Sequence, residues 1–241
     1  MNNMFKIGVA SFALVAATSV FGAGERNDGL RLADEDAVGW TPLAIGIATP
    51  VQLPWGINKW DVFGLDVNVF YSDAPKMYGI DVGGLGAVTR GDMGGLQVGG
   101  LINFAMKDVY GIRATFGGNI ANGTVYGADF GGIGFHRDVY GLEIEFLGGI
   151  SENFNGVQVG GIANVTVKDL YGVAIAIGGN YARVMNGLQI GALFNMTEEL
   201  HGCQIGLVNY AQECPGGFQI GLVNIIMENV LPVLPIFNMS F

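Results

Sequence analysis

The chain has 241 residues, of which 50% are hydrophobic and only 13% are charged. It is too apolar for a disordered segment and too poor in charge for an ordinary soluble surface. A formal net charge of -10, without any basic stripe, argues against nucleic acid as a partner. Past residue 22, polar residues or glycine interrupt every apolar run, so the sequence predicts no membrane-spanning helix.

The N-terminus has the features of a secretory signal peptide over residues 1–22. A weakly basic start, Asn2 to Lys6, precedes a short apolar core, Ile7 to Val20, and small residues for cleavage follow near Gly22 or Ala23. We therefore expect an exported protein. Residues 23–59 are expected to form a leader or extension, in which Thr41 to Leu53 could add a strand.

A short glycine-rich phrase recurs along the rest of the chain. "GLQIGALFN", Gly187 to Asn195, returns as "GCQIGLVN" and "GFQIGLVN". The glycines that start the units are spaced by fourteen to sixteen residues: Gly64, Gly79, Gly95, Gly111, Gly127, Gly141, Gly156, Gly172, Gly187, Gly202 and Gly217. Turn signals such as "NG", "KD" and "ECPGG" lie between the units, which predicts strands joined by tight hairpins.

Within each unit, apolar residues alternate with small or polar ones. From Gly95, residues such as Leu96 and Val98 share one face, and Gln97 and Asn103 share the other. Runs of roughly eleven residues, tilted by about 40°, project to around 25 Å, the height of an outer-membrane apolar band. The pattern predicts an all-β fold, an antiparallel transmembrane β-barrel of about twelve strands over residues 60–241, or fourteen if the segment before it forms a hairpin. The alternative is a β-solenoid, in which Gln would stack on Gln and Asn on Asn.

Two further features depend on the register. An aromatic residue precedes the glycine in six units, and in a barrel these rings would form two interfacial girdles: Phe63, Tyr78, Tyr110, Tyr126, Tyr140 and Tyr171. In the last two units Asn209 and Asn224 fall on the opposite face from the other asparagines, unless a bulge intervenes.

Four charged residues are predicted to project inward on successive strands and to meet near one level: Arg113, Asp129, Glu143 and Glu145. They could form a charged constriction or, as we favour, an ion-paired layer that satisfies buried charges. A paired-carboxylate hydrolytic site is the third reading.

No cofactor and no metal site is predicted. His136 and His201 are expected on the apolar or boundary face, without the partner spacing of metal ligands. Cys203 and Cys214 could form a disulfide or serve as small hydrophobic fillers, and the sequence leaves both open.

Several segments resemble a known family. "VFGLDVNVFYS", "MYGIDVGGLG", the "GLQIGLVN"-like units and "LPVLPIFNMSF" are similar to the bacterial surface repeat-containing family described from spirochaetes, over about Pro42 to Phe241. The resemblance implies no active site. The terminal Phe241 also resembles the signal read by the outer-membrane barrel assembly machinery, which makes that machinery an expected partner.

The turns are short, which argues against recognition through long extracellular loops. The expected function is that of an outer-membrane β-barrel of structural or passive-pore type, located in the cell outer membrane, in contact with its lipid and without catalysis. The alternative is an exported β-solenoid that acts as a surface or scaffold binding protein. An outer-membrane barrel hydrolase is a distant third, since no Ser-His-Asp spacing supports it. A small-molecule ligand stays unassigned.

Overall fold

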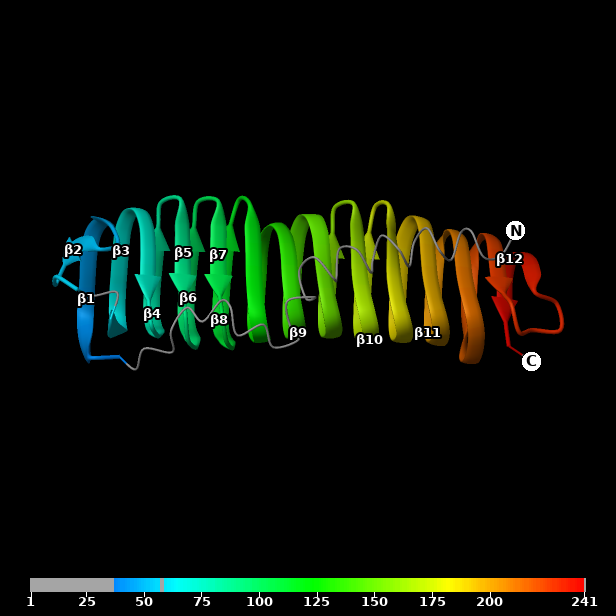
Figure 1. Ribbon diagram of the computed structural model, residues 1–241. Helices are drawn as coiled ribbons and strands as arrows, with labels where there is room; N and C mark the ends of the chain where they lie inside the picture. Colours follow the sequence, from blue (N-terminus) through cyan, green and yellow to red (C-terminus); the bar gives the residue numbers. More distant parts are fainter. Residues whose placement is uncertain (1–36, 57–58, 241) are drawn as a thin grey trace, which may run out of the picture. The chain divides into compact units, whose positions relative to one another are not determined.

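The computed structural model describes residues 37–56 and 59–240 (Figure 1). They belong to the second of two compact units, residues 36–241. The predicted signal peptide and the terminal Phe241 lie outside the described residues. Within the described part all regular structure is β-strand, and no helix is long and apolar enough to cross a membrane.

The strands follow one another along the chain with short bends between them. They are β1 (Gly39–Ala48), β2 (Val51–Leu53), β3 (Trp60–Ala74), β4 (Met77–Gly83), β5 (Gly86–Thr89), β6 (Met93–Gly99), β7 (Ile102–Ala105), β8 (Val109–Thr115), β9 (Gly118–Gly160), β10 (Ala163–Ala176), β11 (Gly179–Ile226) and β12 (Val233–Met239). β9 and β11 each continue through more than one turn of the coil in Figure 1.

The strands form a β-solenoid with two walls. In the first wall β3, β4, β6, β8 and β9 pair in parallel, and in the second β3, β5, β7 and β9 do the same. Among the described strands, only the pairs at the two ends of the coil, β1 with β2 and β11 with β12, are antiparallel. The predicted antiparallel barrel is therefore wrong, and the predicted alternative, a β-solenoid, is the observed fold.

The predicted barrel and the observed solenoid differ in what the chain does at the turn signals. Two of them, "RGD" at Arg90 to Asp92 and "KD" at Lys107 and Asp108, are corners at which the chain passes from the second wall to the first. A second bend, such as the one at Gly84 and Leu85, leads from the first wall to the second. The predicted long strand is therefore two short strands around a corner, and each repeat returns the chain to the same wall one turn further on.

Identical positions of successive turns lie side by side. The register pairs Gly79 with Gly95 and Gly95 with Gly111, so the repeated glycines form one column. Gly111 has a φ of 152°, and a Cβ there would collide with the carbonyl oxygen of Gly95. A side chain at this point would meet both backbone strain and the neighbouring turn, which explains why the phrase starts with glycine.

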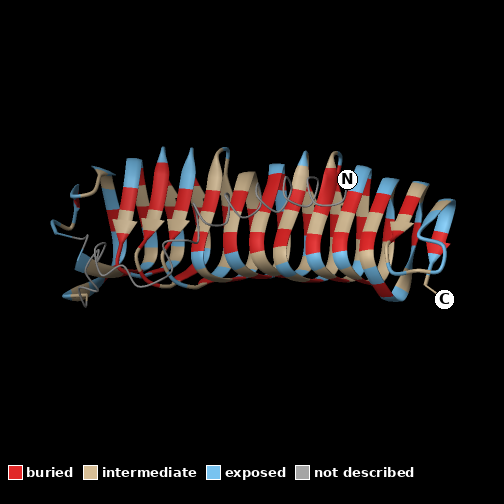
Figure 2. Ribbon diagram, turned by 45° about the vertical axis from the view of Figure 1, so that its right-hand side comes forward, coloured by how far each residue is buried: buried red, intermediate tan, exposed pale blue. Residues whose placement is uncertain are grey.

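The space between the walls holds two kinds of buried residue, drawn red in Figure 2. Next to the corners that carry the charged turn signals lies a hydrophobic core cluster, which includes Val109, Val125, Phe154, Leu170 and Leu200. Further into the coil, stacked asparagines and glutamines are buried: Gln97, Asn103, Asn119, Gln158, Asn164, Asn180, Gln189, Asn195, Gln204, Asn209, Gln219 and Asn224. The predicted stacking of Asn on Asn and Gln on Gln is thus present.

The asparagines of the last two units stay in this column. Asn209 Nδ2 donates a hydrogen bond to Asn224 Oδ1 at 2.8 Å, and Asn195 Nδ2 donates to Asn209 Oδ1 at 2.9 Å. The corner before Asn209 is one residue shorter than the corner before Asn195. Because this corner is one residue shorter, Asn209 points inward although it lies seven residues after its glycine. The predicted placement of Asn209 and Asn224 on the opposite face therefore does not occur.

The aromatic residues form ladders on one wall rather than two girdles. Tyr126 stacks on Tyr110 and on Tyr140, with ring centroids 5.2 and 5.3 Å apart. Phe63 and Tyr78 stack in the same way at 5.4 Å. Because parallel turns bring equivalent positions together, all of these rings lie on the same edge of the first wall.

The segment before residue 60 is part of the coil from Gly39 onward. β1 pairs in parallel with β3, from Gly39 beside Trp60 to Ala48 beside Tyr71, and β2 folds back on β1. The extra strand allowed for Thr41 to Leu53 is therefore a turn of the solenoid joined to a short antiparallel strand.

Candidate functional site

The outer surface of the coil has two corners of opposite character. The corner between the first and second wall, here called the apolar corner, exposes a row of large hydrophobic side chains: Leu85, Leu101, Phe116, Leu147, Ile162, Ile177, Leu193, Leu207 and Leu222. Backbone hydrogen bonds connect its turns, for example from Leu101 N to Leu85 O at 2.7 Å and from Ile162 N to Leu147 O at 2.9 Å. The row recurs on the turns before and after the one that starts at Gly127, where Gly132 occupies the corner instead.

The other corner, here called the charged corner, carries most of the ionised side chains: Arg90, Asp92, Lys107, Asp108, Arg137, Asp138, Glu152, Lys168, Asp169, Arg183, Glu198, Glu199, Glu213 and Glu228. Neighbouring turns are joined here by ion pairs, such as Lys168 to Glu152 at 2.7 Å and Arg183 to Asp169 at 2.8 Å. The sequence thus places its charge on one edge of the coil and its exposed leucines on the other.

Inside the coil the buried amides hydrogen-bond to one another. Asn180 Nδ2 donates to Asn195 Oδ1 and to Ile190 O, each at 2.9 Å, and Asn180 Oδ1 accepts from Asn164 Nδ2 at 2.9 Å. Gln219 donates to Gln204 and Gln204 to Gln189 in the same manner. Such ladders satisfy polar groups that water cannot reach.

The asparagine ladder is broken over two successive turns. It contains Asn103 and Asn119 on one side, and on the other it runs from Asn164 to Asn224. The pairing of Ile150 with Val165 places Gly149 beside Asn164. The hydrogen bond from Ile133 N to Gly117 O places Gly134 beside Asn119. Two glycines therefore stand where asparagines would continue the ladder.

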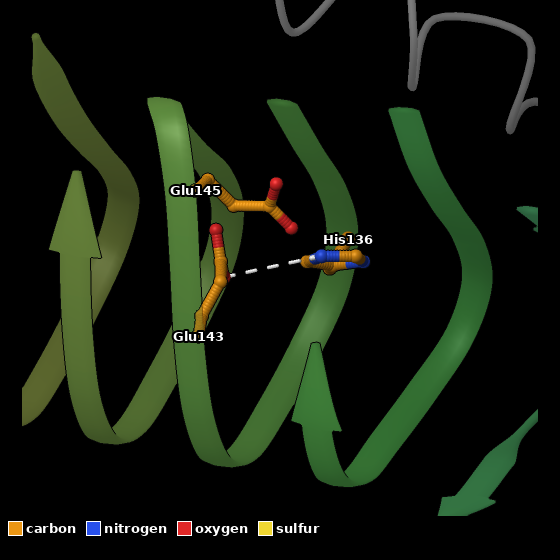
Figure 3. A group of neighbouring side chains, drawn as sticks. All are labelled: His136, Glu143 and Glu145. Atoms are coloured by element: carbon orange, nitrogen blue, oxygen red, sulfur yellow. Dashed lines mark ion pairs between the residues drawn. The ribbon is translucent and has the colours of Figure 1, made fainter. Parts of the chain in front are cut away.

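Ionisable side chains occupy the break. His136, Glu143 and Glu145, all from β9, point into the interior between the walls (Figure 3). All three are buried, with at most 2% of their surface exposed. A Cβ on Gly134 would lie 2.7 Å from Glu143 Oε1 and 2.8 Å from His136 Nε2, and a Cβ on Gly149 would overlap Glu143 Oε1. The two glycines thus provide the volume that the three side chains fill.

Arg113 and Asp129 form a buried ion pair at the edge of this cluster. Arg113 Nε donates to Asp129 Oδ1 at 2.9 Å, and Arg113 Nη2 makes a second, very short contact with Asp129 Oδ2. Burial acts to raise the pKa of Asp129, but the guanidinium outweighs it and holds that pKa below its ordinary value. Arg113 Nη1 also donates to Ile120 O at 2.9 Å, so this pair is well satisfied.

The other three groups are poorly satisfied. Burial lowers the pKa of His136 to about 4, only partly offset by Asp129, so the ring is neutral at pH 7. Burial, and then the charge of Glu145, raise the pKa of Glu143 well above its ordinary value, and burial raises the pKa of Glu145 to about 7. Oε2 of Glu145 has no hydrogen-bond partner, and the carboxyl group of Glu143 meets only the amide of Gln158, in poor hydrogen-bond geometry. His136 Nε2 lies 3.1 Å from Asp129 Oδ2, and its Nδ1 lies 3.3 Å from Arg113 Nη2, so the ring rests against the ion pair.

The structure brings the four predicted charged residues into the interior at neighbouring turns. Arg113 pairs with Asp129, while Glu145 accepts a hydrogen bond from Asn119 Nδ2 at 3.2 Å. Their role as an ion-paired packing layer stays a prediction. The placement of His136 on an apolar or boundary face is wrong, since this ring is fully buried among them. His201 is only partly buried and lies 2.6 Å from Glu199.

Cys203 and Cys214 are both free thiols, Cys203 half-buried and Cys214 buried. The buried ionisable groups are out of reach of a substrate in solution, although the expected lack of catalysis stays a prediction. Comparison with protein-family models, with curated proteins and with solved structures gave no match for this chain.

Proposed function

We propose that this chain is an exported surface scaffold whose solenoid lies against outer-membrane lipid through its apolar corner and holds its charged corner in water. The resemblance of its repeats to the surface repeat-containing family is part of this proposal. A passive pore is not proposed, because the space between the walls is filled by buried side chains.

The segregation of the two corners carries the proposal. Phe116 is 91% exposed and Leu101 is 61% exposed, and each belongs to a row in which most turns place a similar side chain. Monomeric soluble proteins rarely expose a contiguous apolar patch of more than a few hundred Å², so a row of this kind indicates a surface that is covered. The opposite edge carries side chains of both charges that form ion pairs, and such a surface suits contact with water.

A lipid layer matches this surface chemically. Transfer of a half-exposed leucine or isoleucine out of water contributes on the order of 1 kcal/mol, so the row would contribute on the order of 10 kcal/mol before the cost of immobilisation. The backbone groups of the walls pair along the coil with neighbouring turns, and the polar side chains pair inside it. Immersion of this corner therefore exposes few unpaired polar groups to hydrocarbon.

The experiment is flotation of the purified chain with zwitterionic phospholipid vesicles. The chain is expected to float with the vesicles, and the bound fraction should not fall when salt is added, because the contact is apolar. Anionic vesicles should bind it less well at low salt, since its formal net charge is -10.

Matched variants test which corner is used. Leu101→Asp and Leu193→Asp each place a charge on the apolar corner and should reduce flotation severalfold. Asn122→Asp adds the same charge at an exposed position on the charged corner and should leave flotation unchanged. Failure of the chain to float, or an equal loss in all three variants, would contradict the proposal. Self-association without vesicles would indicate that a second copy covers the apolar corner instead.

A further inference from the structure

The break in the asparagine ladder has the composition of a metal site. Its three side chains offer one imidazole nitrogen and two carboxylates, and one ligand atom from each lies within 4.8 Å of the others. Two carboxylates come from one turn, Glu143 and Glu145, and His136 comes from the turn before it (Figure 3). The group therefore joins two turns of the coil.

The unpaired atoms at the break point to a missing partner. Buried polar groups are nearly always hydrogen-bonded, and each exception requires an explanation. Here Oε2 of Glu145 lacks a partner, and the carboxyl group of Glu143 has only the amide of the buried Gln158 on the following turn, in poor hydrogen-bond geometry. Elsewhere the chain satisfies such positions with an asparagine ladder, as at Asn180.

The charges at the break also require compensation. Arg113 offsets Asp129, which leaves the two glutamates without a counter-charge when both are ionised. The His136 ring presents Nε2 toward Glu143, 3.9 Å from Glu143 Oε2, while its Nδ1 lies 3.3 Å from Arg113 Nη2. One divalent cation would bring the set of Glu143, Glu145 and the cation to zero net charge.

We propose that His136, Glu143 and Glu145 bind one divalent first-row transition-metal ion, such as Zn²⁺, inside the coil. Mixed nitrogen and carboxylate ligands suit such ions, whereas Ca²⁺ and Mg²⁺ prefer oxygen alone. Ligand atoms around one such ion lie about 3–4 Å apart, because each metal–ligand bond is about 2.0–2.2 Å long. His136 Nε2 and Glu143 Oε2 already lie 3.9 Å apart, within this range. The site is closed to solvent, so the ion acts as a structural clasp between two turns.

A metal ion at a site closed to solvent has to bind while the chain folds, so the test begins from the unfolded chain. The chain is unfolded with urea and a chelator, freed of both, refolded with Zn²⁺, Mg²⁺ or no metal, and then gel-filtered. Metal content is measured by mass spectrometry, and melting is followed by circular dichroism. We expect about one Zn²⁺ per chain to be retained and the melting temperature to rise with Zn²⁺ but not with Mg²⁺. Co²⁺ in place of Zn²⁺ should give visible absorption bands of a bound ion.

The two histidines of the chain provide a matched pair of variants. His136→Ala should lose the ion and the bands, and it should still fold because alanine occupies the same position one turn earlier, at Ala121. His201→Ala should retain both, since His201 pairs with Glu199 away from the cluster. Glu145→Gln keeps the volume of its side chain and should also lose the ion.

The proposal is overturned if the refolded chain retains no more Zn²⁺ than His136→Ala does. It is also overturned if His201→Ala loses the ion equally, which would indicate adventitious binding. If His136→Ala does not fold, the comparison of Glu145→Gln with the unchanged chain decides the question. Loss of vesicle binding does not bear on this result, because the apolar corner and the cluster are separate.

Discussion

Removal of one asparagine from the middle of the ladder should be among the most destabilising polar substitutions in this chain. Asn180→Ala deletes hydrogen bonds to Asn195 Oδ1, to Ile190 O and from Asn164 Nδ2. At about 1 kcal/mol each, with an added cost for the buried carbonyl oxygens left unpaired, the loss should be about 3–5 kcal/mol. Asn103→Ala, at an end of the ladder, deletes only the bonds to Asn119 and Ala114 O and should cost less.

The measurement is urea unfolding followed by far-UV circular dichroism, compared through midpoints because the turns of a solenoid need not unfold as one unit. Asn122→Ala, on the exposed charged corner, is the control and should change stability by less than about 0.5 kcal/mol. The expected order of loss is Asn180→Ala, then Asn103→Ala, then Asn122→Ala. If Asn180→Ala is no more harmful than Asn122→Ala, the asparagines do not form a dry interior ladder.

Stability should also depend on pH through two buried carboxyls of the first turns. Burial raises the pKa of Asp81 from 3.8 to about 6, and burial with the charge of Asp81 raises that of Asp66 to about 7. A raised pKa means that the stabilising contribution is complete below pH 4 and is lost as the pH rises through 6 to 7. The urea midpoint should therefore be lower at pH 8 than at pH 5, by the equivalent of about 1–1.5 kcal/mol for Asp81, and Asp81→Asn should remove that part. A midpoint that rises with pH would refute this sign. In the glycine column, Gly111→Ala should cost about 3 kcal/mol or more, because it combines a φ of 152° with a collision against Gly95. Gly216→Ala is the control, since the nearest atom to its added Cβ is 4.0 Å away, and a similar loss in both variants would contradict the close stacking of turns.

The repeat predicted which side chains point in and which point out, but it did not predict how strands pair. Gln97 and Asn103 are buried, while Ile102 is exposed, as the alternation indicates. Leu101 is exposed although the alternation places it on the face of Gln97, because it lies at the corner between β6 and β7. Alternation assigns residues to faces and is the same for parallel and antiparallel partners. The choice between a barrel and a solenoid depended on whether the turn signals close a hairpin or a corner. The stacking of identical residues favours the solenoid, because parallel turns in register bring Asn onto Asn at every step.

The position of His136 depended on a single residue in the length of one corner. In the turn that starts at Gly111, three residues lie between Thr115 and the ladder position Asn119. In the next turn only two residues lie between Gly131 and Gly134, so each residue from there to the following corner points to the opposite side from the one that the alternation predicts. His136 therefore points inward, although its odd distance from Gly127 predicted the opposite.

The sequence contains a trace of this change. The step from Gly127 to Gly141 is fourteen residues, while the other steps between the repeated glycines are fifteen or sixteen. The shortest repeat is also the one that places glycine in the ladder and histidine in the column otherwise held by residues such as Ala121 and Ser151. Buried polar and ionic groups are costly unless something satisfies them, and here the same turn supplies the room and the ligand atoms together. A corner of the same length precedes Asn209, where the inward position is Ala211, so it is the histidine in the turn that starts at Gly127, and not the short corner alone, that sets this turn apart.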